Sequence, residues 1–228
     1  MEKYTVQEMK QLMKLYFIMG SNNSKLPPEE VLTQALKGGI TMFQFREKGE
    51  NALVGSAKKE LAKKLQQLCK SYKVPFIVND DVDLAVELNA DGVHIGQDDE
   101  TAHSVREKIG DKILGVSAHS LAEVEAAILA GADYIGIGPI YPTNTKKDAT
   151  EVRGTILIKD VRRQNTDIPI VGIGGITAAN ATPVMEAGGD GVALISEISA
   201  SNNPQLQTER VLAAVSNHSE ENKVFSEN

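Results

Sequence analysis

The sequence predicts one α/β domain of the (β/α)8 class, a TIM barrel. Short apolar runs rich in β-branched and aromatic residues alternate with longer amphipathic segments, and eight such pairs follow one another. A chain of 228 residues can build one sizeable core but not two comfortable domains, and it lies near the lower end of the usual barrel length. We expect a single domain over 1–228, with the barrel at about 15–216 and a polar, frayed tail at 217–228.

The expected strands are the apolar runs at 15–20, 42–47, 75–80, 92–96, 113–118, 134–139, 168–175 and 191–196. Helices are expected near 28–38, 53–72, 82–89, 101–109, 121–130, 156–164, 177–187 and 204–215. The alternative is an open doubly wound sheet, which often carries a phosphate-binding loop after its first strand. Because 20–24 lacks the glycine fingerprint of that loop, the barrel is favoured.

A short pattern recurs where three of the expected helices end and the next strands begin. Each copy pairs a small residue with an aspartate, at Ala90-Asp91, Ala132-Asp133 and Gly189-Asp190. The small residue can close the helix, and the aspartate can accept hydrogen bonds from backbone amides in the turn. Such turns lie at the amino-terminal end of a barrel, where they contribute to stability, so we assign them no catalytic role.

Composition and charge exclude several classes of function. The formal net charge is −7 and the basic residues form no dense block, so nucleic acid is not an expected partner. A single cysteine, Cys69, excludes an internal disulfide and a cysteine-based zinc cluster, and suits a reducing compartment. The first 14 residues are charged throughout, unlike a secretory signal, and no apolar run approaches the roughly 18 residues of a membrane span. We expect a soluble cytoplasmic protein that contacts no membrane, and a homo-oligomer is compatible with the sequence.

The second expected strand ends with three polar side chains on one face. Gln44, Arg46 and Lys48 alternate with Phe43 and Phe45, so the period of two puts the phenyl rings on the helix-covered outside and the polar side chains inside. Two inward cations are costly without an anionic partner. The alternatives are a structural ion pair with neighbouring acidic residues and a clamp for phosphate or pyrophosphate, and we favour the clamp.

Acidic residues follow the third and fourth expected strands. Asp80 lies at the end of the third strand and Asp99 shortly after the fourth, so both would lie beside the cationic side chains. Mg²⁺ prefers one or two carboxylates together with phosphate oxygens, which makes these two aspartates candidate magnesium ligands. Helix N-capping is the alternative for aspartates in such positions, and we expect it for some of Asp81, Asp83 and Asp98.

The remaining strand ends carry hydroxyl groups and glycines. Ser117, at the end of the fifth strand, is placed either to bind a phosphate or to cap the next helix. The segment 143–146 offers two hydroxyls and a cation within a long connection, which is either a functional lid or a solvated loop. Gly175 and Ser196 follow the seventh and eighth strands, the usual phosphate site of this barrel class.

Taken together and in this order, these segments resemble the thiamine-phosphate synthase family. The resemblance spans about 16–199, nearly the whole barrel, and each segment alone would be weak. The segments are Gln44-Phe-Arg-Glu-Lys48, Val78-Asn-Asp-Asp81, Gly92-Val-His-Ile-Gly-Gln97, Gly115-Val-Ser117, Gly138-Pro-Ile-Tyr-Pro-Thr-x-Thr-Lys146 and Gly172-Ile-Gly-Gly-Ile176. The family implies a transferase that joins 4-amino-2-methyl-5-hydroxymethylpyrimidine pyrophosphate to a thiazole monophosphate, releases pyrophosphate, and uses one Mg²⁺ per subunit.

The resemblance also implies roles for individual residues, all of which lie near or after the end of an expected strand. Asp80 and Asp99 would hold the magnesium ion, and the catalytic group would comprise Arg46, Lys48, Ser117 and Lys146. The pyrimidine pyrophosphate would be bound by Gln44, Arg46, Lys48 and Asn79, with Ser117 and Lys146 assisting. The thiazole phosphate would be contacted by Thr143, Thr145, Gly175, Ile195 and Ser196. Phe45, Glu47 and Asn144 are further expected substrate-binding residues.

The chemistry that the resemblance implies is dissociative. Pyrophosphate departs first, the aminopyrimidine stabilises the methylene cation, and the thiazole nitrogen attacks it. No protein nucleophile is required, which agrees with the absence of a Gly-x-Ser-x-Gly elbow around Ser117. The alternatives are a thiazole tautomerase-like relative, a non-catalytic thiamine-phosphate sensor and a sugar-phosphate isomerase. The first two need neither the cationic clamp nor the metal carboxylates, and the third would need an acid–base pair where Met19 and Pro139 stand.

Overall fold

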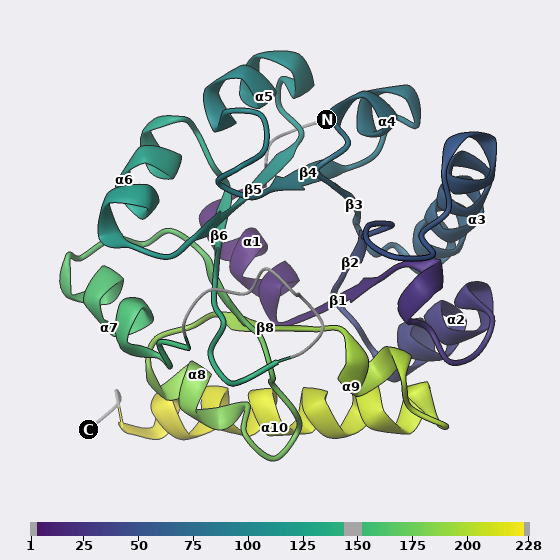
Figure 1. Cartoon of the computed structure of the whole chain (residues 1–228). Coiled ribbons are helices and arrows are strands. Elements are labelled where there is room, and N and C mark those ends of the chain that lie inside the picture. Colours follow the sequence, from purple (N-terminus) through teal and green to yellow (C-terminus); the bar gives the residue numbers. More distant parts are fainter. Residues whose placement is uncertain (1–3, 144–151, 226–228) are drawn as a thin grey trace.

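Eight parallel strands form a closed barrel in sequence order (Figure 1). The computed structural model describes residues 4–143 and 152–225, with side chains as far as residue 216. The strands are β1 (Leu15–Met19), β2 (Met42–Phe45), β3 (Phe76–Asn79), β4 (Gly92–Ile95), β5 (Ile113–Ala118), β6 (Tyr134–Ile137), β7 (Ile170–Ile173) and β8 (Gly191–Leu194). β1 pairs with β8 and closes the ring, so the predicted fold class is confirmed.

Helices surround the barrel, as Figure 1 shows. They are α2 (Pro28–Gly38), α3 (Gly55–Tyr72), α4 (Val82–Glu87), α5 (Ala102–Ile109), α6 (Leu121–Leu129), α7 (Ile156–Arg163), α8 (Thr182–Glu186) and α10 (Pro204–Phe225), with the short η1 (Ser21–Asn23) and α9 (Ser196–Ser199) after β1 and β8. α8 is shorter than the helix expected at 177–187, because the Asn180 side chain accepts a hydrogen bond from the Thr177 amide and forms a turn there. α10 is longer than expected and includes most of the segment that we expected to be frayed.

Most strands end one or two residues earlier than the apolar runs suggest. Asp80 and Gly174 have positive φ angles, +61° and +100°, which a continuing strand does not allow. Ser196 begins α9 instead of ending β8. The polar residues at the strand ends therefore lie in turns at the mouth of the barrel.

The helix α1 (Val6–Met13) was not predicted from the sequence, although only Glu8 and Lys10 of its eight residues are charged. Thr5 and Glu8 form a capping box at its start, and Met9 and Met13 are buried. Both methionines pack in the cluster inside the barrel, with Tyr16 and Met42 among its members. In Figure 1, α1 lies across the centre of the ring of strands, so it closes the amino-terminal end of the barrel.

The core has two layers, one inside the barrel and one between the strands and the helices. The outer layer contains the rings of Phe17, Phe43, Phe45 and Phe76, as the alternation on β2 predicts. Gln44 points the other way and is buried inside the barrel, with only 1% of its surface exposed. The alternation of β2 thus directs its polar residues to the interior and the mouth.

The aspartates of the recurring turns hold the amino-terminal end together. Each carboxylate accepts a hydrogen bond from an amide in the first two residues of a neighbouring strand: Asp91 from Phe76 at 2.8 Å, Asp133 from Leu114 at 2.9 Å, and Asp190 from Ile170 at 2.8 Å. Arginine side chains complete two of the turns, because Arg106 pairs with Asp133 at 2.6 Å and Arg162 with Asp190 at 2.7 Å. These aspartates accept hydrogen bonds from backbone amides as expected, but the amides belong to neighbouring strands and not to the turns themselves.

Candidate active site

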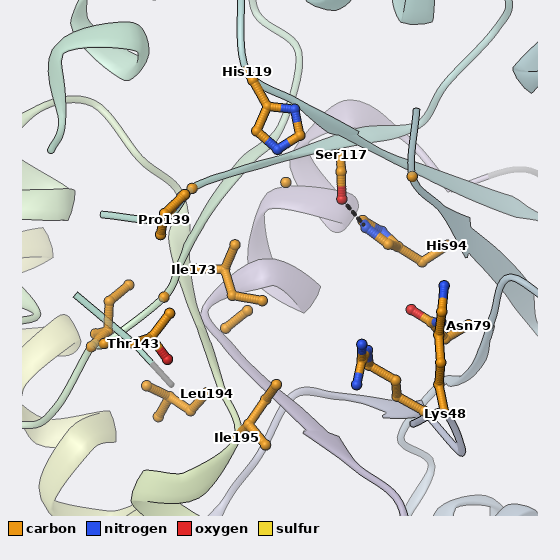
Figure 2. Close-up of a pocket in the computed structure, with 18 of the residues that line it drawn as sticks. Lys48, Asn79, His94, Ser117, His119, Pro139, Thr143, Ile173, Leu194 and Ile195 are labelled. Atoms are coloured by element: carbon orange, nitrogen blue, oxygen red, sulfur yellow. Dashed lines mark hydrogen bonds between the residues drawn. The ribbon is translucent and has the colours of Figure 1, made fainter. Parts of the chain in front are cut away.

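A cavity opens at the carboxyl-terminal end of the barrel, where all the strands point. Figure 2 shows Lys48 and Asn79 on one side of it and Thr143, Leu194 and Ile195 on the other. The structure brings ten of the expected site residues to its wall: Arg46, Lys48, Asn79, Asp80, Asp99, Ser117, Thr143, Gly175, Ile195 and Ser196. They come from every part of the chain between β2 and β8, which the closed barrel gathers at one end.

Arg46 follows β2 and is the most unusual charge in this cavity. Its backbone amide continues the ladder by donating to the Met19 carbonyl at 2.9 Å, which places the side chain at the mouth. The residue is only 9% exposed, and its guanidinium has no hydrogen bond or ion pair within the described part of the chain. The guanidinium faces the open cavity with its hydrogen-bond donors unused by the described residues, and such a planar cation is able to bind an anion.

Lys48 lies between the two candidate metal ligands. Its ammonium group is 2.6 Å from the nearer Asp80 oxygen and 4.0 Å from Asp99. The hydrogen bond that Lys48 donates to Asp80 raises the pKa of Lys48. Burial raises the pKa of Asp80 in spite of Lys48, and Asp99 adds to the rise. For Asp99, the Gly96 amide, Asp80 and Lys48 outweigh burial and lower the pKa.

The backbone and the donor set around these carboxylates suit a magnesium ion. Asp80 has the left-handed φ of +61°, a conformation often kept at functional sites, and its amide donates to the His94 carbonyl at 2.9 Å. Among the described residues no group of three or more metal-ligating side chains occurs, so a metal held here would keep positions for water or phosphate oxygens. Mg²⁺ is bound in this way, by one or two carboxylates plus substrate oxygens. Asp81 instead caps α4 through the Leu84 amide at 3.0 Å, as expected.

Ser117 and His94 form a hydrogen-bonded pair in the wall. The distance from Ser117 Oγ to His94 Nε2 is 2.9 Å, and the bond is drawn in Figure 2. The sequence suggested that His94 is a core histidine without a ligand role, whereas it also lines the cavity. Two glycines, Gly115 on β5 and Gly136 on β6, leave the space that the His94 ring occupies, and they are a sequence signal for its position. A Cβ on Gly115 would lie 2.5 Å from His94 Nδ1, and one on Gly136 would lie 3.2 Å from Cε1.

The end of β7 reaches the cavity through a glycine turn. Gly175 has a φ of +63°, and a Cβ there would meet the Pro142 carbonyl at 2.5 Å. This glycine is therefore required by the connection packed over it, a reason that the sequence did not reveal. Ile195 and Ser196 follow β8 and line the same side of the cavity. The expected residues Asn144, Thr145 and Lys146 lie outside the described residues.

Three expected substrate-binding residues do not line the cavity. Gln44 lies beneath it and donates a hydrogen bond to Tyr16 at 2.7 Å. Phe45 packs outside the barrel, 6.2 Å from the Phe76 ring centre. The Glu47 carboxylate accepts hydrogen bonds from the Ser21 amide and hydroxyl and from the Leu53 amide, all at 2.6–2.7 Å. Phe45 and Glu47 thus support the segment that carries Arg46 and Lys48.

The fold and this cavity together define a (β/α)8-barrel protein whose mouth carries an arginine, a lysine and the two aspartates Asp80 and Asp99. The family model of thiamine monophosphate synthase matches residues 15–198, and the chain belongs to that family. It is accordingly an enzyme, a transferase of thiamine biosynthesis.

Relatives and a solved structure agree with this assignment. The thiamine-phosphate synthase of Geobacillus thermodenitrificans is 58% identical over 215 residues, which cover 94% of this chain and 97% of the relative. That of Bacillus licheniformis is 57% identical over 209 residues, or 92% and 93% of the two chains. The solved thiamine phosphate pyrophosphorylase from Pyrococcus furiosus superposes with a TM-score of 0.81 at 33% identity, covering 92% of this chain and 98% of that one. In the described part of this chain, no helix is both long and apolar enough to span a membrane.

Proposed function

We propose that the chain condenses 4-amino-2-methyl-5-hydroxymethylpyrimidine pyrophosphate with a thiazole monophosphate to form thiamine phosphate and pyrophosphate. The observation that carries this proposal is Arg46, a residue only 9% exposed whose guanidinium faces the cavity without a partner among the described residues. Its planar fork matches two oxygens of a pyrophosphate. A ligand of that charge would supply the counter-ion that the described residues do not provide.

The pyrophosphate belongs on the side of the cavity formed by β2 to β5. Arg46, Lys48, Asn79 and Ser117 offer it positive charge and hydrogen-bond donors, with Lys146 as a further cation. Asp80 and Asp99 would hold one Mg²⁺, which when bound neutralises the charge that develops on the departing pyrophosphate. In the structure Lys48 lies 2.6 Å from Asp80, so it is placed to exchange that contact for a pyrophosphate oxygen.

The thiazole phosphate belongs on the opposite side, formed by the ends of β6 to β8. Thr143, Gly175, Ile195 and Ser196 lie there, and Asn144 and Thr145 follow in sequence. This arrangement places the two phosphate groups apart and the two rings between them. Holding two reactants in such a geometry replaces a bimolecular encounter by a step within one complex, which contributes several kcal/mol of the barrier.

The reaction needs no protein nucleophile. The bond between the methylene carbon and the pyrophosphate oxygen breaks, and its electron pair leaves with the pyrophosphate. The aminopyrimidine ring stabilises the resulting cation, and the lone pair of the thiazole nitrogen forms the new carbon–nitrogen bond. Ser117 is bonded to a histidine, but the other nitrogen of His94 faces Tyr134 rather than a carboxylate, which disfavours a hydrolase triad.

The experiment is to mix both substrates with the purified protein and Mg²⁺ and to measure pyrophosphate and thiamine phosphate together. We expect the two products in equal amounts. Consumption of the thiazole phosphate without pyrophosphate would instead indicate a tautomerase-like relative. Binding of thiamine phosphate without turnover would indicate a sensor, and either result would overturn the proposal.

A further inference from the structure

A row of hydrogen-bonded side chains lies inside the barrel beneath the cavity. It begins with Gln44 on β2, continues through Tyr16 on β1, Tyr134 on β6 and His94 on β4, and ends with Ser117 on β5. The four successive distances are 2.7 Å (Gln44 Nε2 to Tyr16 Oη), 2.8 Å (between the two Oη atoms), 2.9 Å (Tyr134 Oη to His94 Nδ1) and 2.9 Å (His94 Nε2 to Ser117 Oγ). The three middle residues, the tyrosine–histidine row, have no role in the proposed reaction.

The barrel interior is shaped around the tyrosine–histidine row. Tyr16 and Tyr134 are almost completely buried, with 1% and 0% of their surfaces exposed. A Cβ on Gly115 would lie 2.3 Å from the Tyr134 hydroxyl, so only glycine leaves room for this ring. The His94 and Tyr134 rings are stacked, with centres 5.5 Å apart. Polar groups so deeply buried are expensive unless each finds a partner, and each of them does.

The direction of the hydrogen bonds follows from counting protons. Burial raises the pKa of both tyrosines, so each phenol is neutral and has one proton to donate. Gln44 donates to Tyr16, so Tyr16 must donate to Tyr134, its only other partner among the described residues. Tyr134 then donates to His94 Nδ1, which leaves the proton of a neutral imidazole on Nε2. Nε2–H donates to Ser117 Oγ.

This direction of the hydrogen bonds determines what Ser117 presents to the cavity, because the Ser117 oxygen already accepts a hydrogen bond from His94. Its own hydroxyl hydrogen is free to point into the cavity, toward the place proposed for the pyrophosphate. In the reverse direction Ser117 would donate to His94 and present only lone pairs to an anion, which repel it. The direction of the hydrogen bonds therefore decides whether Ser117 presents a donor or an acceptor to the highly charged leaving group.

We propose that Tyr16, Tyr134 and His94 are positioning residues that hold His94 as the Nε2–H tautomer and make the Ser117 hydroxyl a hydrogen-bond donor toward the substrate pyrophosphate. The inference rests on the proposed function, which places the pyrophosphate within reach of Ser117. Gln44 lies at the far end of the row and sets the direction of its hydrogen bonds, because its amide donates to Tyr16.

The first test reads the tautomer directly, by ¹⁵N NMR of the labelled protein without substrates. His94 is assigned by the loss of its signals in His94→Gln. We expect the Nε2–H tautomer in the wild-type protein and a mixture of tautomers in Tyr134→Phe, where Nδ1 has lost its donor. The matched control is Tyr141→Phe, which removes a tyrosine hydroxyl bonded to the Asn180 carbonyl outside the row and should leave the His94 signals unchanged. An Nδ1–H or doubly protonated His94 in the wild-type protein overturns the inference.

The second test asks whether the row acts through Ser117. Tyr134→Phe should lower kcat for the condensation by about tenfold, the effect of one misdirected charge-assisted hydrogen bond. In a Ser117→Ala background the same change should cost less than about twofold, because the hydroxyl that it misdirects is already absent. Equal losses in both backgrounds would show that the row acts on something other than Ser117. Tyr16→Phe is the second variant, and thermal melting shows that each variant is folded.

The two proposals fail separately. A wild-type protein that makes no thiamine phosphate overturns the proposed function, while the NMR measurement still reports the direction of the row. A wild-type protein that makes thiamine phosphate but carries the other tautomer overturns only the role of the tyrosine–histidine row.

Discussion

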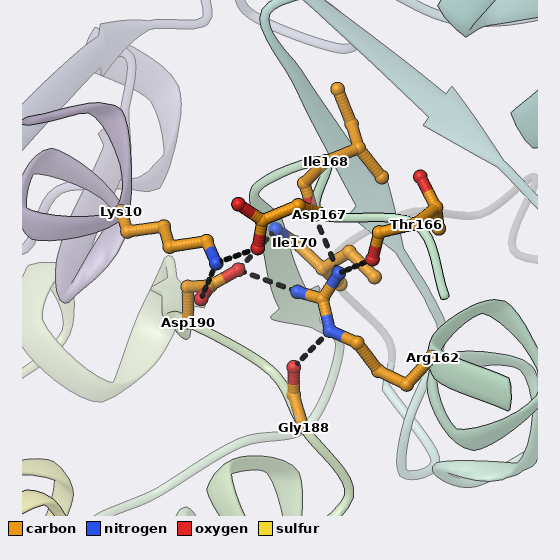
Figure 3. Close-up of polar contacts among 8 residues, drawn as sticks. All are labelled: Lys10, Arg162, Thr166, Asp167, Ile168, Ile170, Gly188 and Asp190. Atoms are coloured by element: carbon orange, nitrogen blue, oxygen red, sulfur yellow. Dashed lines mark hydrogen bonds and ion pairs between the residues drawn. The ribbon is translucent and has the colours of Figure 1, made fainter. Parts of the chain in front are cut away.

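The arginines at the two ends of the barrel differ in whether other residues of the chain pair with them. At the amino-terminal end, Arg162 donates to the carbonyls of Gly188, Thr166 and Ile168 and pairs with Asp190 (Figure 3). Arg106 makes the same kinds of contact with three carbonyls and an aspartate, Asp133. At the carboxyl-terminal end, Arg46 is less exposed than these two partly buried arginines but has no such partner in the described part of the chain. The satisfied charges hold strands and turns in register, whereas the unsatisfied one is available for a ligand.

The lysines at the two ends of the barrel, Lys10 and Lys48, also contact carboxylates with different consequences. Lys10 is paired with Asp167 and lies 3.9 Å from Asp190, so α1 is tied to the Arg162 cluster, as Figure 3 shows. Lys48 at the other end also contacts two carboxylates, but these carboxylates line the cavity. A similar ion pair thus serves to anchor a helix at one end and to prepare a binding site at the other.

The largest effect should come from removing the unpaired charge. We expect Arg46→Ala to lower kcat/KM for the pyrimidine pyrophosphate roughly a hundredfold or more, because two charge-assisted hydrogen bonds are lost. The free energy of unfolding should not fall, since a buried cation without a partner contributes no pairing energy. Steady-state kinetics and urea denaturation measure the two quantities, and calorimetry should show unchanged binding of the thiazole phosphate. Equal weakening of both ligands would contradict the division of the cavity into two sides.

Replacing Arg162 at the amino-terminal end should reduce stability and leave turnover unchanged, the reverse of the effect expected for Arg46→Ala. We expect Arg162→Leu to lower the free energy of unfolding by about 2 kcal/mol, because it removes the ion pair with Asp190 and leaves three carbonyl groups without their donor. Turnover of the folded protein should remain at the wild-type level. A stable Arg162→Leu protein with impaired catalysis would show that the two ends are coupled rather than separate.

The carboxylates allow a second comparison, between neighbouring residues. Asp80→Ala should lower turnover at least roughly tenfold, equivalent to about 1.4 kcal/mol of barrier, and EDTA should abolish it. Asp81→Ala should instead lower the free energy of unfolding by about 1 kcal/mol, since its carboxylate caps α4. Activity assays with and without added Mg²⁺ distinguish them, and full turnover in metal-free buffer would contradict the metal assignment.

The smallest effect concerns two serines of α9. Ser196 lines the cavity, and Ser196→Ala should weaken binding of the thiazole phosphate about threefold, because one neutral donor is lost. Ser199 donates instead to the Asn23 carbonyl at 2.8 Å and is buried. Ser199→Ala should therefore reduce stability and leave the affinity measured by calorimetry unchanged. A larger loss of affinity in Ser199→Ala than in Ser196→Ala would reverse the assignment.

Local sequence patterns predicted much of the barrel and many residues of its mouth. The alternation of Phe43, Gln44 and Phe45 identified the faces of β2, because successive side chains of a strand point in opposite directions. The helix α1 was missed although its capping box is local, because the burial of Met9 and Met13 inside the barrel is decided only by the tertiary structure. The tyrosine–histidine row was not predictable, since Tyr16 and Tyr134 are 118 positions apart and meet only when the barrel closes.

The sequence by itself determined the class of fold, the end of the barrel at which each polar residue lies, and the anionic character of the expected ligands. These depend on backbone geometry over a few residues, which the pattern of apolar and polar side chains expresses directly. Only the tertiary structure decided which charges are satisfied: it gave Arg106 and Arg162 their partners, gave Glu47 a role in supporting a loop, and left Arg46 without a partner among the described residues. Pairing depends on distances between strands that are remote in sequence, and those distances exist only once β8 has paired with β1.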